Sequence, residues 1–166
     1  MNWMLLAMWM FGCGYERFQK RLDNQEFSHW YALRVYMTEE DRKTYLKLKT
    51  KEERDNYLKK NELWDRFYKY DADVRDAIVS GDVKEGWSRD MLEMAWGAPY
   101  DRQRAVGRQA ERSEKFVYRF EQQPDGRVLL WESNSKTQYK AIRLFVREVI
   151  IDDDVVVKIS ERDSSW

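Results

Sequence analysis

The feature that most constrains this fold is a change in hydrophobic periodicity near Lys115. Before this point, apolar residues recur at steps of three or four, which is typical of helices. After it, Phe116, Tyr118 and Phe120 alternate with other residues at steps of two, which is typical of strands. Helices followed by strands predict an α+β fold: N-terminal helices, a helix-turn-helix pair, and a 3-4-stranded antiparallel β-meander that packs on them.

The predicted strands are separated by polar turn sequences. A hairpin is expected at Pro124-Asp125-Gly126, between the strand that begins at Lys115 and a return strand over 127–132. A long strand over 138–151 follows, and Asp152–Asp154 turns it into a last strand over 155–160. The polar segment 97–113 is interpreted as a mobile connection between the helices and the sheet.

Three helices are predicted in the first 70 residues. The first covers 16–36, and Thr38 caps a second whose first turn is acidic. Thr50 and Glu53 match a capping box, which predicts that a third helix begins there and continues to about Tyr70.

Two shorter helices are expected next, and glycines mark their ends. Residues 74–80 precede Gly81, which is expected at the C′ position. A turn at Gly86 leads to a helix over 89–96, which Ser88 caps and which Gly97 and Pro99 terminate. We expect Gly97 to adopt the left-handed conformation.

The N-terminal segment is uncharged up to Tyr15. Its apolar run of about 11 residues would form about 16 Å of helix, too short for a hydrocarbon core of about 30 Å. Met10-Phe11-Gly12-Cys13 resembles a bacterial lipobox, which implies that Cys13 is acylated and becomes the mature N-terminus. The alternative is a free, buried cysteine in an N-terminal helix. The chain therefore divides into a signal-like segment (1–13), a helical region (14–70) and an α+β domain (71–166).

Two families share short motifs with the middle of the chain. The residues Gly81, Val83, Gly86, Ser88, Gly97 and Pro99 match the spacing of BamE (SmpA/OmlA)-like outer-membrane assembly lipoproteins, which this stretch resembles. Gly86-Trp87-Ser88-Arg89-Asp90 is similar to the namesake motif of GWxTD-domain proteins, with Arg89 in place of threonine. The first resemblance implies a lipid-anchored protein at the periplasmic face of the outer membrane, with other envelope proteins as partners.

Few residues in this sequence suggest catalysis. The formal net charge is zero, which disfavours nucleic acid as a partner. His29 is the only histidine, so a Ser-His-Asp triad would have to use it, and a structural role is the better interpretation. Asp152–Asp154 could bind a hard cation, but a solvated hairpin tip is expected instead. We predict a protein that is not an enzyme and has no metal or cofactor.

The aromatic residues, which include eight tryptophans, are the strongest indication of binding. Most are expected in the core, whereas Trp87, Trp64 and Trp131 are candidate partner-binding residues because tryptophan is a favoured interface anchor. The leading hypothesis is a non-enzymatic scaffold subunit with a flat exposed patch. The alternatives are a GWxTD-type domain protein, a soluble peptide- or small-ligand-binding module with a concave pocket, or, last, a hydrolase that uses His29.

Overall fold

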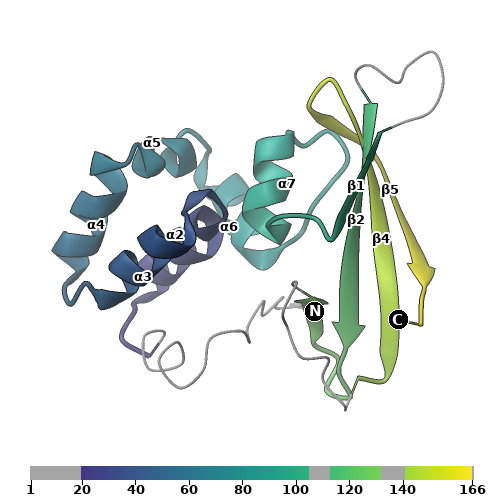
Figure 1. Cartoon of the computed structure of the whole chain (residues 1–166), viewed down its shortest axis with the longest axis horizontal. Coiled ribbons are helices and arrows are strands. Elements are labelled where there is room, and N and C mark those ends of the chain that lie inside the picture. Colours follow the sequence, from purple (N-terminus) through teal and green to yellow (C-terminus); the bar gives the residue numbers. More distant parts are fainter. Residues whose placement is uncertain (1–19, 105–112, 132–140, 166) are drawn as a thin grey trace.

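The structure, a computed structural model, describes residues 20–104, 113–131 and 141–165. Its helical part comprises α2 (Asn24–Leu33), the 3-10 helix η1 (Arg34–Tyr36), α3 (Glu39–Lys47), α4 (Lys51–Lys60), α5 (Leu63–Tyr68), α6 (Ala72–Ser80) and α7 (Arg89–Trp96). The strands are β1 (Asp101–Arg104), β2 (Ser113–Gln122), β3 (Val128–Trp131), β4 (Arg143–Asp152) and β5 (Val155–Asp163). Figure 1 shows α7 between the other helices and the sheet. The predicted α+β class and the antiparallel sheet are confirmed.

Capping residues set the starts of the first helices. Thr38 and Thr50 accept hydrogen bonds from the third backbone N–H of α3 and α4, as the sequence predicts. Asp23 does the same for α2, which therefore begins at Asn24, later than expected. Each cap satisfies a backbone donor that the helix itself leaves unpaired.

The helix predicted from Thr50 to about Tyr70 is broken in two. Asn61 donates its side-chain amide to the carbonyl of Tyr57 at 2.8 Å, which competes with continued helix formation. Glu62 then adopts a left-handed conformation with φ 59°, and α5 starts in a new direction. The apolar spacing continues through this break, so periodicity alone could not reveal it.

The sheet is not a simple meander. Strand β2 is central: β4 pairs along one edge over its whole length, while β1 and β3 share the other edge. Strand β4 matches β2 in length, and this pairing places Phe145 beside Phe120 and Val149 beside Phe116 on one face. Strand β4 therefore lies on the edge of β2 opposite to β3, although β3 and β4 are consecutive among the described strands.

The described part of the sheet has five strands, and β1 was not predicted. Its four residues are all exposed and polar, so they lack the apolar alternation that identifies a strand. The strand forms because it pairs with β2, and it occupies part of the segment interpreted as a mobile connection. The predicted turn at Asp152–Asp154 is confirmed: Asp153 and Asp154 both have positive φ, as a two-residue hairpin turn requires.

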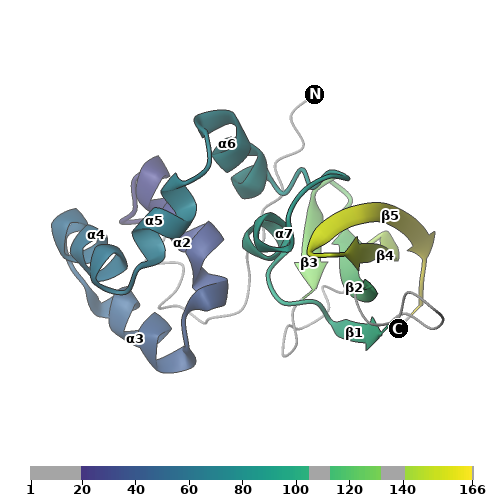
Figure 2. The same cartoon turned by 90° about the horizontal axis from the view of Figure 1, so that it is seen from above.

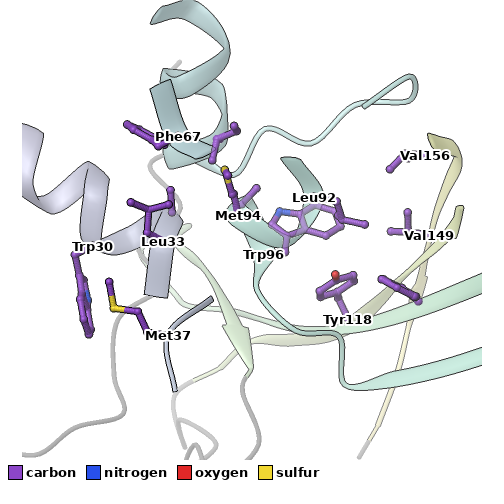
Figure 3. Close-up of a cluster of buried hydrophobic side chains, with 14 of the residues drawn as sticks. Trp30, Leu33, Met37, Phe67, Leu92, Met94, Trp96, Tyr118, Val149 and Val156 are labelled. Atoms are coloured by element: carbon purple, nitrogen blue, oxygen red, sulfur yellow. The ribbon is translucent and has the colours of Figure 1, made fainter. Parts of the chain in front are cut away.

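Helix α7 is buried on more than one side. Figure 3 shows Met94 close to Phe67 and Leu33 of the other helices, while Trp96 and Leu92 face Tyr118 and Val149 of the sheet. Trp96 meets the rings of Tyr118 and Phe120 edge to face, both at centroid distances of 5.2 Å. One hydrophobic core thus continues across the predicted boundary between residues 70 and 71.

Side chains from the helical part and from the sheet also bind the C-terminal end of α7. The Tyr31 hydroxyl donates to the carbonyl of Ala95 at 2.7 Å, and the Tyr118 hydroxyl donates to that of Gly97 at 3.2 Å. The carbonyls at a helix C-terminus have no partner within the helix, so these bonds satisfy acceptors that burial would otherwise leave unpaired.

Gly97 has the predicted positive φ but not the left-handed helical conformation. Its φ is 72° and its ψ is −159°, a region open essentially only to glycine. Gly81, with φ 72° and ψ 22°, has the expected left-handed geometry. Pro99 follows α7 as predicted and leads into β1.

A buried ion pair connects the first helices. Arg54 of α4 donates through Nε to Glu26 of α2 at 2.8 Å, and through Nη1 to the carbonyl of Leu48 at 3.0 Å. Glu26 also accepts the backbone N–H of Asp23 at 2.9 Å, which completes the cap of α2. This pair therefore joins α2, α4 and the end of α3.

Residues 1–13, including Cys13, lie outside the described residues, so the lipobox interpretation stays a prediction. Among the described residues, the helices are all too short or too polar to cross a membrane.

The first prediction concerns Gly97. Gly97→Val should lower the free energy of unfolding by about 1–3 kcal/mol, because valine is strained at this φ and ψ. A new Cβ would meet only Arg34 Nη2, at 3.9 Å, so the cost is conformational and not a clash. Chemical denaturation measures it, with the exposed neighbour Ala98 changed to valine as the control. Equal stability of the two variants would refute the assigned conformation.

The second prediction concerns the buried ion pair. Arg54→Met should destabilise the protein by about 3–5 kcal/mol, because it leaves the Glu26 carboxylate buried without its cation. Lys51→Met is the matched control: it removes an exposed pair with Asp23 on the same two helices and should cost less than about 1 kcal/mol. Urea unfolding measures the free energy of unfolding of both variants. If both lose a similar amount, the buried pair contributes no more to stability than the exposed pair, and the prediction is wrong.

Candidate partner-binding site

The three tryptophans predicted to bind a partner lie in different surroundings and form no common patch. Trp64 of α5 stacks on Tyr68 with a centroid distance of 4.5 Å. Trp87 lies in the turn before α7, and Trp131 ends β3. All three side chains are half-buried, and Trp64 and Trp87 pack against the core.

The Gly86–Asp90 segment attaches α7 to the β4–β5 hairpin. Gly86 donates its N–H to the carbonyl of Val156 at 2.7 Å, and Val156 donates back to Trp87 at 2.8 Å. Arg89 forms an ion pair with Asp154 at the hairpin tip, at 2.9 Å, and another with Glu114 of β2. These contacts give Trp87 and its neighbours a structural role, and Asp154 is paired with an arginine.

Asp90, the second residue of α7, receives four hydrogen bonds from other elements. The donors are the hydroxyls of Tyr36 (2.6 Å) and Tyr70 (3.0 Å), the guanidinium of Arg66 (2.9 Å) and the ammonium of Lys69 (2.8 Å). Burial alone would raise the pKa of Asp90, but the hydrogen bonds from Lys69, Tyr36 and Tyr70 outweigh it and hold that pKa below its ordinary value. The carboxylate therefore stays charged and fixes the start of α7 to α5 and η1.

Trp131 belongs to a compact cluster with Tyr100 and Arg119. The guanidinium carbon of Arg119 lies 3.5 Å from the centroid of the Tyr100 ring and 5.3 Å from that of Trp131. The two rings meet edge to face at 5.3 Å. Tyr100 is 44% exposed, whereas most large hydrophobic residues that the structure describes are buried or half-buried. We call these three residues the Tyr–Arg–Trp cluster.

The register of the sheet brings this cluster together. Arg119 alternates with Tyr118 and Phe120, whose side chains face α7, so it projects from the opposite face of β2. Its cross-strand partner in β3 is Trp131. Tyr100 comes from just before β1 and donates its N–H to the carbonyl of Val117 at 2.8 Å, which places it on the same edge of β2. Figure 2 shows the described helices together on one side of the sheet.

The other candidate sites in the described residues, His29 and a possible metal site, have less support. His29 is buried, with the Tyr68 hydroxyl 2.7 Å from its Nε2 and Asp55 3.8 Å from its Nδ1, and its role as a structural histidine stays a prediction. The residues that the structure describes contain no group of three histidine, cysteine or acidic side chains that could hold a metal ion. In the Tyr–Arg–Trp cluster the exposed Tyr100 contacts the half-buried Arg119 and Trp131, and these are residue types that dominate binding energy at protein interfaces.

Sequence reasoning identified Trp131 but missed Tyr100 and Arg119. Arg119 could have been noticed as a charged residue in the middle of an apolar strand. No local pattern could have joined Tyr100 to it, because that contact depends on the pairing of β1 with β2. Comparisons of the chain with protein-family models, curated proteins and solved structures find no match.

The third prediction tests the role of Asp90. Asp90→Ala should cost about 2–3 kcal/mol of stability at neutral pH, because it removes charge-assisted hydrogen bonds to both cations. Since the folded-state pKa of Asp90 lies below that of the unfolded chain, this stabilisation is present at neutral pH and is lost as pH falls below about 4.

The measurement is urea unfolding of both proteins between pH 7 and pH 3. The control is Asp82→Ala, because Asp82 makes an exposed pair with Lys84 and should contribute less than about 1 kcal/mol. If the difference in free energy of unfolding between wild type and Asp90→Ala does not become smaller in acid, the assigned role of Asp90 is wrong.

Proposed function

We propose that this protein is a non-enzymatic interaction subunit that binds a partner protein through the Tyr–Arg–Trp cluster. The observation that carries this proposal is the mutual contact of Arg119, Tyr100 and Trp131, with Arg119 on the face of β2 away from α7. Mutual contact restrains all three side chains before binding, so a partner would lose less conformational entropy in ordering them. Tyrosine, tryptophan and arginine are also the residues most often found at interface hot spots.

The proposed location is the periplasmic face of the outer membrane, with Cys13 as the lipid anchor and other envelope proteins as partners. The lipobox-like sequence before Cys13 and the BamE-like spacing of Gly81 to Pro99 support this part of the proposal. An acyl anchor would supply the membrane affinity, since each buried CH₂ contributes about 0.8 kcal/mol. The polypeptide after the anchor would then be available to bind partners.

The fourth prediction tests partner binding by site-specific photo-crosslinking in cells of the source organism. A photoreactive phenylalanine at Tyr100 of the full-length chain should give a discrete protein adduct. The same probe at Val157, which has a similar exposure of 47% against 44%, is the matched control. Trp131→Ala should reduce the Tyr100 adduct several-fold. Equal adducts at both positions, or an adduct that Trp131→Ala leaves unchanged, would contradict the proposal.

The fifth prediction tests the anchor separately. The native protein, expressed from its natural start, should carry added acyl mass at Cys13 and enter the detergent phase on phase separation. Cys13→Ser should lose both properties. If the purified native protein retains residues 1–12 and has no added mass, the anchor proposal is wrong, while partner binding through the cluster remains open to its own test.

A further inference from the structure

His29 is fully buried where α2, α4 and α5 meet, with an exposed fraction of 0%. Its Nε2 lies 2.7 Å from the hydroxyl oxygen of Tyr68 on α5. Its Nδ1 lies 3.8 Å from Oδ1 of Asp55 on α4, beyond hydrogen-bond distance. Within the described part of the chain, neither Nδ1 of His29 nor Oδ1 of Asp55 has a hydrogen-bond partner. Buried polar atoms are usually paired, so this arrangement calls for an explanation.

The neighbouring hydrogen bonds favour a neutral imidazole. Lys51 donates to Oε1 of Gln25 at 2.9 Å, and Nε2 of the same amide donates to the Tyr68 oxygen at 2.9 Å. The hydroxyl proton of Tyr68 can then point to Nε2 of His29, which lies 2.7 Å from the hydroxyl oxygen. In this arrangement the ring is neutral and carries its proton on Nδ1, facing Asp55.

We propose that His29 is an acid-sensitive latch that holds α5 against α2 at neutral pH and releases it when the imidazole is protonated. A proton on Nε2 changes that atom from acceptor to donor. The Tyr68 oxygen then faces two donors, from Gln25 and His29, and its own hydroxyl proton loses its acceptor. The charged ring is meanwhile attracted to Asp55 on α4, away from Tyr68.

Helix α5 is also held to α7, where Arg66 donates to Asp90 at 2.9 Å, so the release concerns the contact of α5 with α2 at Tyr68. It has six residues, and its N-cap Glu62 makes no side-chain capping bond. Its attachment near the latch consists largely of ring contacts: His29 meets Trp64 at 5.0 Å and Phe67 at 5.6 Å. These apolar contacts favour the neutral imidazole over the charged one.

The surrounding charges include both signs. Asp55 and Lys51 face the ring from α4, Glu26 contributes from α2 and Asp23 from its cap, and Arg75 of α6 lies 4.8 Å above the Tyr68 ring. Burial is the largest influence and lowers the pKa of His29 below its ordinary value, although Asp55 acts to raise it. The unfolded or released state therefore binds the proton more readily, so the latched state loses stability as pH falls below about 6.5.

The lone histidine allows a direct test on the unmodified full-length protein by NMR. The single imidazole Cε1 signal should titrate with a midpoint below 6.5, the ordinary histidine value. Over the same range, amide protection factors in 63–68 should fall relative to those in α7, by up to about tenfold between pH 7.5 and 5.5. A midpoint at or above 6.5, or unchanged protection in 63–68, would overturn the proposal.

Two variants separate the latch from general acid sensitivity. His29→Gln keeps a side-chain acceptor for Tyr68 but cannot titrate, so protection in 63–68 should no longer depend on pH. Tyr68→Phe keeps the buried imidazole but removes the hydroxyl, so the pH-dependent loss of protection in 63–68 should become smaller by the part that this hydrogen bond contributes. The same loss of protection in either variant as in wild type would overturn the proposal. If His29→Gln does not fold, Tyr68→Phe decides alone.

Discussion

The burial of α7 between two groups of elements is the constraint on which the rest of this structure depends. Met94 packs towards the helical region, whereas Leu92 and Trp96 pack towards the sheet (Figure 3). The apolar residues of this eight-residue helix spread over one wide arc, so more than one neighbouring element is needed to cover them. The cover comes from chain segments before and after it, so neither the helices nor the sheet can complete its core without the other.

Polar contacts at the two ends of α7 make this burial possible. At the start of α7, Asp90 accepts hydrogen bonds from η1, from α5 and from Lys69, which directly follows α5. At the end of α7, two tyrosine hydroxyls donate to the backbone carbonyls. Buried helix ends without such partners would carry the free-energy cost of unpaired polar groups. The Gly86–Asp90 segment thus has a physical role that does not require it to bind anything outside the molecule.

This arrangement also determines where the proposed binding cluster lies. One face of β2 is occupied by α7, so its alternate residues project from the other face, where Arg119 meets Tyr100 and Trp131. The proposed binding cluster is therefore a consequence of strand alternation combined with burial of α7. The His29 latch lies at the opposite end of the molecule, in α2, α4 and α5, and would regulate that region independently.

Local chemistry explains what the sequence could predict. Threonine caps, the Ser88 cap and the Gly81 terminus involve residues a few positions apart, and each appears where expected. The break at Asn61, strand β1 and the transfer of β4 to the far edge of β2 depend on competing bonds or on distant pairing. The same distinction applies to the site: Trp131 is conspicuous in the sequence, but its contact with Tyr100 exists only in the folded sheet.

Residue-resolved hydrogen exchange of the full chain in low denaturant tests most directly whether α7 makes the molecule one cooperative unit. The slowest amides of α2 and of β2 should open with the same free energy and the same dependence on denaturant, because both pack on α7. Opening of α2 at a free energy several kcal/mol below that of β2, while β2 stays protected, would show two independent units and contradict this view of the fold.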